Sequence, residues 1–196
     1  MDALCHVYTD EQFYNRNSAH EFASHSGASH CGIEKTGGFA GRAVLLDVAG
    51  YQGVEWLEPG TNVTADDLEA CRAAQEVELR AGDVLLVRTG WLDAFAARGD
   101  AMYYPQAGLG ASTVEYIAAH DIAAVGTDNG AVEVMPFDGR YLNLHIELLA
   151  KRGVTLLEHL VLSPLAADGV RECLLVVGPL LITGGTGSPV NPIAIA

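Results

Sequence analysis

Short, continuous apolar runs recur along the chain from residue 43 onward, and more polar stretches separate them. The clearest are Ala43–Val48 (AVLLDV), Val84–Arg88 (VLLVR) and Ile122–Gly126 (IAAVG). Runs of this length without alternation are typical of strands that are buried on both faces. Weaker candidates for further strands are Thr155–Leu160, Cys173–Val177 and Val190–Ile195.

Helix boundary signals lie between these runs. Two resemble capping boxes: Thr64-x-x-Asp67 predicts a helix that runs to about Gln75, and Ser112-x-x-Glu115 predicts one that runs to about His120. A third helix is predicted over Asn143–Arg152, because Gly153 follows it. Such boxes satisfy the free N–H groups of a first turn, and glycine is favoured just past a helix end. Alternating strands and helices predict an α/β domain with a mixed, largely buried sheet, and one domain over residues 1–196.

The composition of the chain, above all its net charge, makes some classes of binding partner unfavourable. The chain has 25 acidic residues against 11 Lys and Arg, a formal net charge of −14, which disfavours nucleic acid and anionic membrane surfaces as partners. Its four cysteines are scattered without a CxxC pair, and no cationic segment precedes an apolar one at the N-terminus. We therefore expect a cytoplasmic protein with reduced thiols.

Residues 1–40 differ from the rest, because they hold four of the seven histidines and show no clear periodicity. They are predicted to form a long ordered loop or a segment that builds a site. His20, His25 and His30 recur every five residues, which fits neither a helix nor a strand, so we interpret them as part of a solvated loop.

Two small constellations could carry chemistry. Asp2 and His6 lie four residues apart, a spacing that by itself is as typical of a solvated surface as of a site. His145 lies on a predicted helix, and Glu158 interrupts the apolar run TLLEHL. A carboxylate within an apolar strand is costly unless it is paired, protonated or bound to metal, so Glu158 is the most informative acid. The adjacent His159 is expected on the opposite face of that strand.

Polar residues also follow the third buried run. Asp128 and Asn129 come directly after IAAVG, and residues at the carboxyl ends of strands often line active-site crevices in α/β proteins. Turn formation explains them equally well, since Asp and Asn side chains bond to their own backbone. The glycine-rich segment 184–189 lacks the lysine and following helix of a phosphate-binding loop, so a tight turn is the simpler interpretation.

The opening letters M-D-A-L-C-H resemble the end of H-x-G-T-H-x-D-x-x-x-H, the motif of the cyclase family of metal-dependent hydrolases, which includes kynurenine formamidases and isatin hydrolases. The resemblance implies a swivelling β/β/α fold in a homodimer or homotetramer. It implies that Asp2 is a metal ligand and His6 the catalytic acid/base. His145 and Glu158 match the downstream ligands of a divalent Zn or Mn ion.

The same resemblance implies that the substrate is a small amide or lactam, such as N-formylkynurenine or isatin. It implies that metal-activated water hydrolyses this substrate, as in an arylformamidase of tryptophan catabolism. Phe13 and Tyr14 are candidates to line its pocket, alongside Asp128 and Asn129, and simple packing explains the two aromatic residues equally well.

The chain departs from the motif in one respect. The two histidines of H-x-G-T-H would precede Met1 and are absent, which indicates either an internal start codon or a truncated product. We therefore expect the chain as given to be inactive or nearly so. The alternative is a non-catalytic paralogue that serves as a binding or oligomerisation module.

Overall fold

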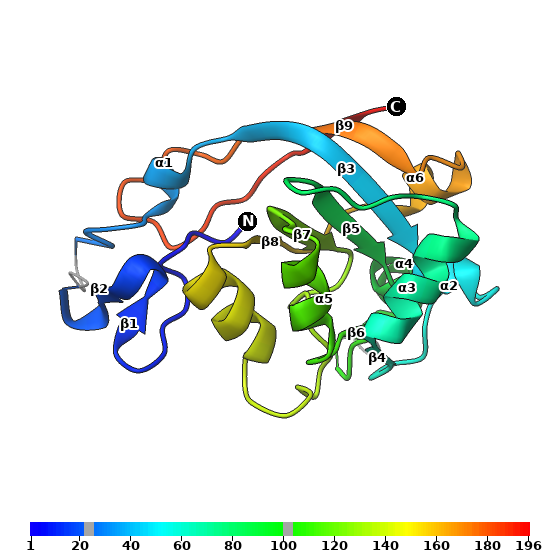
Figure 1. Cartoon of the computed structure of the whole chain (residues 1–196), viewed down its shortest axis with the longest axis horizontal. Helices are drawn as coiled ribbons and strands as arrows, with labels where there is room; N and C mark the ends of the chain where they lie inside the picture. The colour runs from blue at the N-terminus through cyan, green and yellow to red at the C-terminus, as the bar shows by residue number, and fades with distance from the viewer. Residues whose placement is uncertain (22–25, 100–103) are drawn as a thin grey trace.

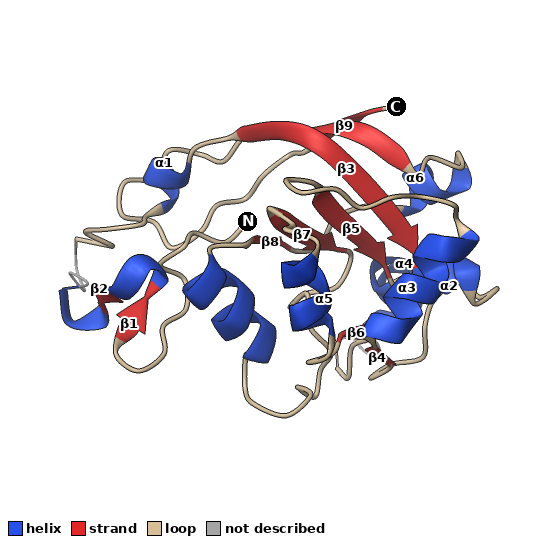
Figure 2. Ribbon diagram, in the orientation of Figure 1, coloured by secondary structure: helices blue, strands red, loops and turns tan. Residues whose placement is uncertain are grey.

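A computed structural model describes residues 1–21, 26–99 and 104–196. At its centre is a six-stranded mixed sheet with strand order β10-β9-β3-β5-β7-β8 (Figures 1 and 2). The strands are β3 (Phe39–Asp47), β5 (Val84–Arg88), β7 (Ala124–Thr127), β8 (Thr155–Leu157), β9 (Glu172–Val177) and β10 (Ile193–Ile195). The first four are parallel in the order β3-β5-β7-β8, so their carboxyl ends share one edge of the sheet. β9 runs antiparallel to β3, and β10 antiparallel to β9.

The predicted apolar runs form the middle of this sheet. β5 has the predicted bounds and is buried along its whole length, because strands lie on both sides of it and side chains cover both faces. β3 starts at Phe39 rather than Ala43, since its first residues pair with β9. β8 is shorter than predicted and ends at Leu157, which leaves Glu158 just beyond its carboxyl end. The mixed α/β fold is confirmed, and the interpretation of Glu158 as a residue inside a strand is wrong.

Side chains cover both faces of the sheet. One face packs against α3 (Ala65–Ala74), α5 (Thr113–Ala119) and the π-helix η4 (His145–Ala150), and the other against α6 (Ser163–Ala167) and flanking loops. The largest fully buried side chains are aliphatic: Ile33, Leu45, Leu46, Leu68, Leu85, Leu86, Leu109, Ile117, Leu144, Leu148, Leu149 and Leu156. Burial of such side chains stabilises the fold by roughly 1.5–3 kcal/mol each before entropy is counted.

The two predicted capping boxes have different outcomes. At α3, the Thr64 hydroxyl accepts from the Asp67 N–H at 3.2 Å and the Asp67 carboxylate accepts from the Thr64 N–H at 2.8 Å, so this box is confirmed. At α5 the box is wrong, because Ser112 does not cap its own helix. Its hydroxyl instead accepts from the Ala65 N–H at the start of α3, at 3.1 Å.

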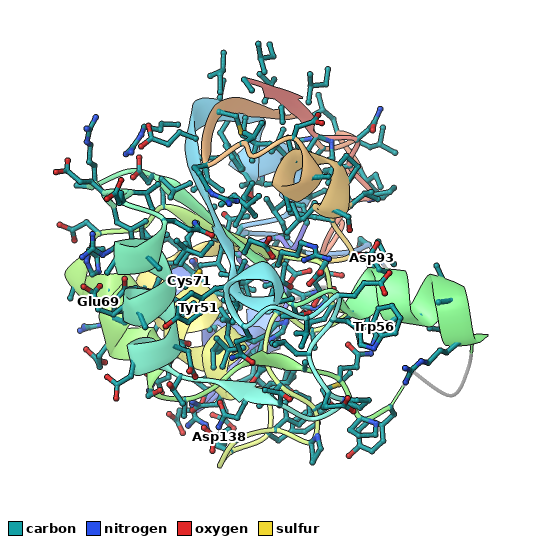
Figure 3. All side chains as sticks on the ribbon, turned by 90° about the vertical axis from the view of Figure 1, so that its right-hand side faces the viewer. Tyr51, Trp56, Glu69, Cys71, Asp93 and Asp138 are labelled. Carbon is teal, nitrogen blue, oxygen red and sulfur yellow. The ribbon has the colours of Figure 1, made fainter. Side chains whose placement is uncertain are left out.

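The remaining elements are short. They are β1 (Gln12–Phe13), η1 (Tyr14–Arg16), β2 (Asn17–Ser18), η2 (Ala19–Glu21), α1 (Ile33–Thr36), α2 (Val48–Tyr51), β4 (Asn62–Val63), α4 (Trp91–Arg98) and β6 (Gly108–Leu109). Figure 3 views the end formed by α2, α3 and α4, where Glu69 lies on the outer side of α3 while Cys71 on the same helix is fully buried. Within the described residues, no helix is both long and apolar enough to cross a membrane.

Candidate metal centre

Asp2 lies on an extended segment between the edge strand β8 and the loop around residues 186–188. The Asp2 N–H donates to the Leu156 carbonyl of β8 at 3.0 Å. On the other side, the Ala3 N–H donates to the Thr186 carbonyl and the Ser188 N–H to the Met1 carbonyl, both at 3.0 Å. Figure 1 shows this N-terminal segment beside the segment around residue 186. The backbone that carries Asp2 is therefore fixed on both sides.

His145 and Glu158 meet Asp2 at this edge. His145 is the first residue of η4, and Glu158 follows the end of β8. The His145 Nε2 atom lies 3.6 Å from Asp2 Oδ2 and 3.6 Å from Glu158 Oε1. The three side chains, named here the His145 cluster, offer ligand atoms that all lie within 4.8 Å of one another. Three residues 13 to 156 positions apart in the sequence thus share one site.

The cluster has an acceptor without a donor. Asp2 is buried, and its Oδ2 atom has no hydrogen-bond partner. An unsatisfied buried carboxylate oxygen costs about 1–3 kcal/mol or more, so its position calls for a cation. One imidazole nitrogen and two carboxylates suit Zn and Mn alike. Among residues 1–21, 26–99 and 104–196, this is the only group of three or more such side chains close enough to hold a metal ion.

Sequence reasoning missed a fourth member of this site, Glu133. Its carboxylate is fully buried, and its Oε1 atom lies 2.7 Å from His145 Nδ1. Burial lowers the pKa of the His145 imidazole, but the three neighbouring carboxylates, those of Asp2, Glu133 and Glu158, outweigh burial and raise that pKa to about 11. Glu133 interrupts the apolar run AVEVM, the same signal that singled out Glu158, so the sequence did contain the clue.

His6 is exposed beside the His145 cluster, with 6.3 Å between its ring centroid and that of His145. Its Nδ1 atom lies 3.1 Å from the Thr186 carbonyl oxygen. A carbonyl can only accept, so this contact requires the proton on Nδ1 and leaves Nε2 of the neutral ring as a base.

A pocket of about 470 Å³ opens next to His6. It is lined by Cys5, His6, Tyr8, Glu11, Phe13, Ala19, His20 and Thr186. Of the two aromatic residues proposed for substrate contact, Phe13 lines the pocket. Tyr14 does not, because its ring lies against Gly153, three residues beyond the end of η4. The space at this position is available only because Gly153 has no Cβ atom.

Asp128 and Asn129 are buried, and their polar atoms are committed to the protein. The Asp128 carboxylate accepts from the N–H and hydroxyl of Thr89 and from the Gly90 N–H, while burial raises its pKa. The Asn129 amide donates to the carbonyls of Ala107 and Glu133. Most of these contacts run to other segments of the chain rather than to the local backbone that the turn interpretation expects, and substrate contact by Asp128 or Asn129 stays a prediction.

The other histidines lie apart from the cluster. His20 is exposed and lies 3.3 Å from Glu11, and His30 is exposed, as the interpretation of a solvated loop predicts. His25 lies outside the described residues. The opposite-face prediction for His159 is wrong, because the residue follows the strand end in a left-handed conformation (φ 54°). Its ring lies 5.6 Å from that of Trp91.

Comparisons with known proteins bear on the family and the fold. The model of the Cyclase family matches residues 1–134. A crystal structure of a cyclase is 35% identical with a TM-score of 0.89, and the match covers 100% of this chain and 67% of that one. No match was found among curated proteins.

Two more distant solved structures share the fold. Isatin hydrolase A from Ralstonia solanacearum is 21% identical, with a TM-score of 0.66, and the match covers 98% of this chain and 69% of that one. A protein described as a predicted metal-dependent hydrolase from Bacillus stearothermophilus is 18% identical, with a TM-score of 0.58 and coverages of 98% and 73%.

Proposed function

The chain belongs to the Cyclase family, and from this premise we propose that it is a metal-dependent hydrolase of a cyclic or aryl amide. One observation carries the proposal: the buried Oδ2 atom of Asp2 has no hydrogen-bond donor, yet it faces His145 Nε2 at 3.6 Å beside Glu158. The unsatisfied oxygen, a second carboxylate and an imidazole together form a set of ligands that suits a divalent ion.

Asp2, His145 and Glu158 would hold the ion, which we expect to be Zn or Mn. When bound, such an ion supplies Lewis acidity that activates water, lowering its pKa to about 7, and polarises a carbonyl. Three protein ligands are also the number typical of catalytic zinc sites, which leave a position open for water or substrate.

His6 is proposed as the acid/base. Its Nδ1–H is held by the Thr186 carbonyl, so Nε2 is the atom that takes a proton from the attacking water and returns it to the leaving amine. The exposure of His6 at the rim of the pocket gives a substrate access to this atom. Phe13, which is 3% exposed, forms an apolar part of the pocket wall and suits a flat ring such as an aryl amide or lactam.

The proposal is tested by metal content and hydrolysis together. The purified chain is loaded with Zn or Mn, dialysed and analysed for metal, and then assayed with isatin and N-formylkynurenine as probes. We expect about one retained ion per chain and a turnover that His6→Asn lowers by about 10²–10⁴-fold without loss of the ion.

A chain that retains no ion contradicts the proposal. The expectation of low turnover for a chain without H-x-G-T-H stays a prediction, and the assay also measures it. An ion retained without any hydrolysis of amide or lactam probes would support a role in binding alone.

A second candidate function is a binding or oligomerisation module, and one observation favours it. Leu174 and Val176 of β9 are exposed and pair in register with the exposed Ile195 and Ile193 of β10. Contiguous exposed apolar side chains are typical of protein–protein contact surfaces. Sedimentation of the native chain and of Val176→Glu tests this role: a larger species that the substitution dissociates supports it, and two identical monomers contradict it.

A further inference from the structure

Glu133 has an unusual position for a carboxylate. It is 0% exposed, beside apolar core residues, and no Lys or Arg pairs with it among the ion pairs of the described residues. Its oxygens instead accept from one short segment. Oε1 lies 2.7 Å from His145 Nδ1 and 3.4 Å from the His145 backbone N, and Oε2 lies 3.2 Å from the Leu144 backbone N.

One carboxylate therefore holds both the main chain and the side chain of His145. The two N–H groups belong to the start of the helix, where backbone donors have no partner within the helix. The contact with Nδ1 fixes the rotation of the imidazole ring. It also makes Nδ1 the hydrogen-bonded nitrogen, so that Nε2 is the atom directed at Asp2 and Glu158.

Glu133 is itself held by the end of β7. The Thr127 hydroxyl donates to Asn129 Oδ1 at 2.6 Å, and the Asn129 amide donates to the Glu133 carbonyl at 3.1 Å. Gly108 approaches the Glu133 main chain so closely that a Cβ atom there would lie 2.5 Å from its carbonyl. A continuous series of contacts thus runs from the central sheet through Asn129 and Glu133 to the ring of His145.

We infer that Glu133 is a positioning residue that orients His145 as a metal ligand, with Asn129 fixing Glu133 in turn. The inference rests on the proposed metal-binding function and extends it to a residue that does not touch the ion. Carboxylates that hold the second nitrogen of a ligand histidine typically contribute 10–100-fold to metal affinity, because they fix the ring and raise its basicity.

Glu133→Gln is the first test, since it keeps the shape of the side chain while it replaces one acceptor with a donor. We expect the affinity for Zn, measured by chelator competition, to fall by about 10–100-fold in the folded variant. Asp67→Asn is the matched control: it removes a carboxylate that caps α3, a helix without cluster residues, and should leave the affinity for Zn unchanged. An affinity of Glu133→Gln equal to that of the native chain overturns the inference.

A second measurement uses the native metal-free chain, so it does not depend on a variant that folds or on bound metal. In NMR spectra, a proton on His145 Nδ1 bonded to a buried carboxylate should resonate far downfield and exchange slowly with water. A rapidly exchanging Nδ1 proton overturns the inference, even if Zn binds. Failure of the native chain to bind Zn would instead refute the proposed function, and the downfield proton would still support the role of Glu133 in orienting the ring.

Discussion

Two groups of buried or partly buried charged side chains lie near the carboxyl edge of the sheet, and they differ in how the charges of their carboxylates are compensated. In the Arg88 cluster, defined as Asp47, Arg88 and Asp93, the guanidinium donates to Asp47 at 2.8 Å and to Asp93 at 3.2 Å. Asp93, labelled in Figure 3, also accepts from the Ser163 hydroxyl, and Asp47 from the Gly50 N–H. The His145 cluster has no Lys or Arg among its described ion-pair partners.

The unsatisfied atoms of the two clusters have opposite character. In the Arg88 cluster the buried atom without a partner is Nε of Arg88, a donor on a side chain that is already cationic. In the His145 cluster it is Asp2 Oδ2, an acceptor on an acid. A donor beside a fixed cation offers nothing to a metal ion, whereas an acceptor among other acceptors does. Whether the unsatisfied atom is a hydrogen-bond donor or an acceptor therefore distinguishes a structural ion pair from a candidate metal-ligand site.

The largest expected effect is the loss of the structural cation. Arg88→Met leaves Asp47 buried without its charge partner, and removal of one partner from a buried ion pair costs about 3–5 kcal/mol. We expect a loss of this size in the free energy of unfolding, measured by urea denaturation. Combining the change with Asp47→Asn should recover part of it. A loss below about 1 kcal/mol for Arg88→Met would contradict the structural role assigned to this cluster.

The next effect concerns the unsatisfied acceptor itself. Asp2→Asn keeps the size of the side chain but removes its charge, and we expect the affinity for Zn to fall by more than the 10–100-fold typical of a residue outside the ligand set. Saturating Zn should also stabilise the native chain, by about 2.7 kcal/mol at 100 times its dissociation constant, and the variant much less. Thermal unfolding with and without Zn measures both. Equal stabilisation of the two chains would show that Asp2 is not a ligand.

The smallest expected effect on stability concerns an exposed ion pair, that of Arg42 and Glu172. Arg42 donates to both oxygens of Glu172, at 2.7 and 3.0 Å, and this hydrogen bonding lowers the pKa of the Glu172 carboxyl. A lowered pKa adds stability above the unfolded value of about 4.3, and the contribution is lost as the pH falls through the folded value. Because Glu172 is half exposed, Glu172→Gln should cost under about 1 kcal/mol at pH 7.

The pH dependence of that cost is the sharper test. The difference in unfolding free energy between the native chain and Glu172→Gln should shrink below about pH 4, as the native carboxyl is protonated. Urea denaturation at pH 7, 4 and 3 gives the comparison. A difference that grows on acidification would contradict the ion pair.

Local sequence patterns predicted the elements whose causes are local. VLLVR forms β5 with the predicted bounds, since a run of large apolar residues can only be buried on both faces. The Thr64 box at α3 depends on residues three apart, and it forms. The Ser112 box fails because the serine hydroxyl bonds to the start of α3, 47 residues away in the sequence, a contact that no local pattern reveals.

In the candidate site, too, local sequence indicated some residues, while the roles of others depend on the tertiary fold. A carboxylate in an apolar run drew attention to Glu158, although the side chain lies beyond the strand rather than in it. Glu133 had the same signal, but its role depends on the ring of His145, which only the tertiary fold brings to 2.7 Å. Asp128 and Asn129 follow a strand as active-site residues often do, yet hydrogen bonds to residues as far away as Thr89 occupy them.

The backbone hydrogen bonds around Asp2 have a consequence for biosynthesis. Met1 and Ala3 bond to Ser188 and Thr186, so the residues on either side of Asp2 are held by residues more than 180 positions further along the chain. On the ribosome, Asp2 leaves the exit tunnel long before residues 186–188 are made. The hydrogen bonds with residues 186 and 188 that fix the segment around Asp2 can therefore form only after that part of the chain has been synthesised.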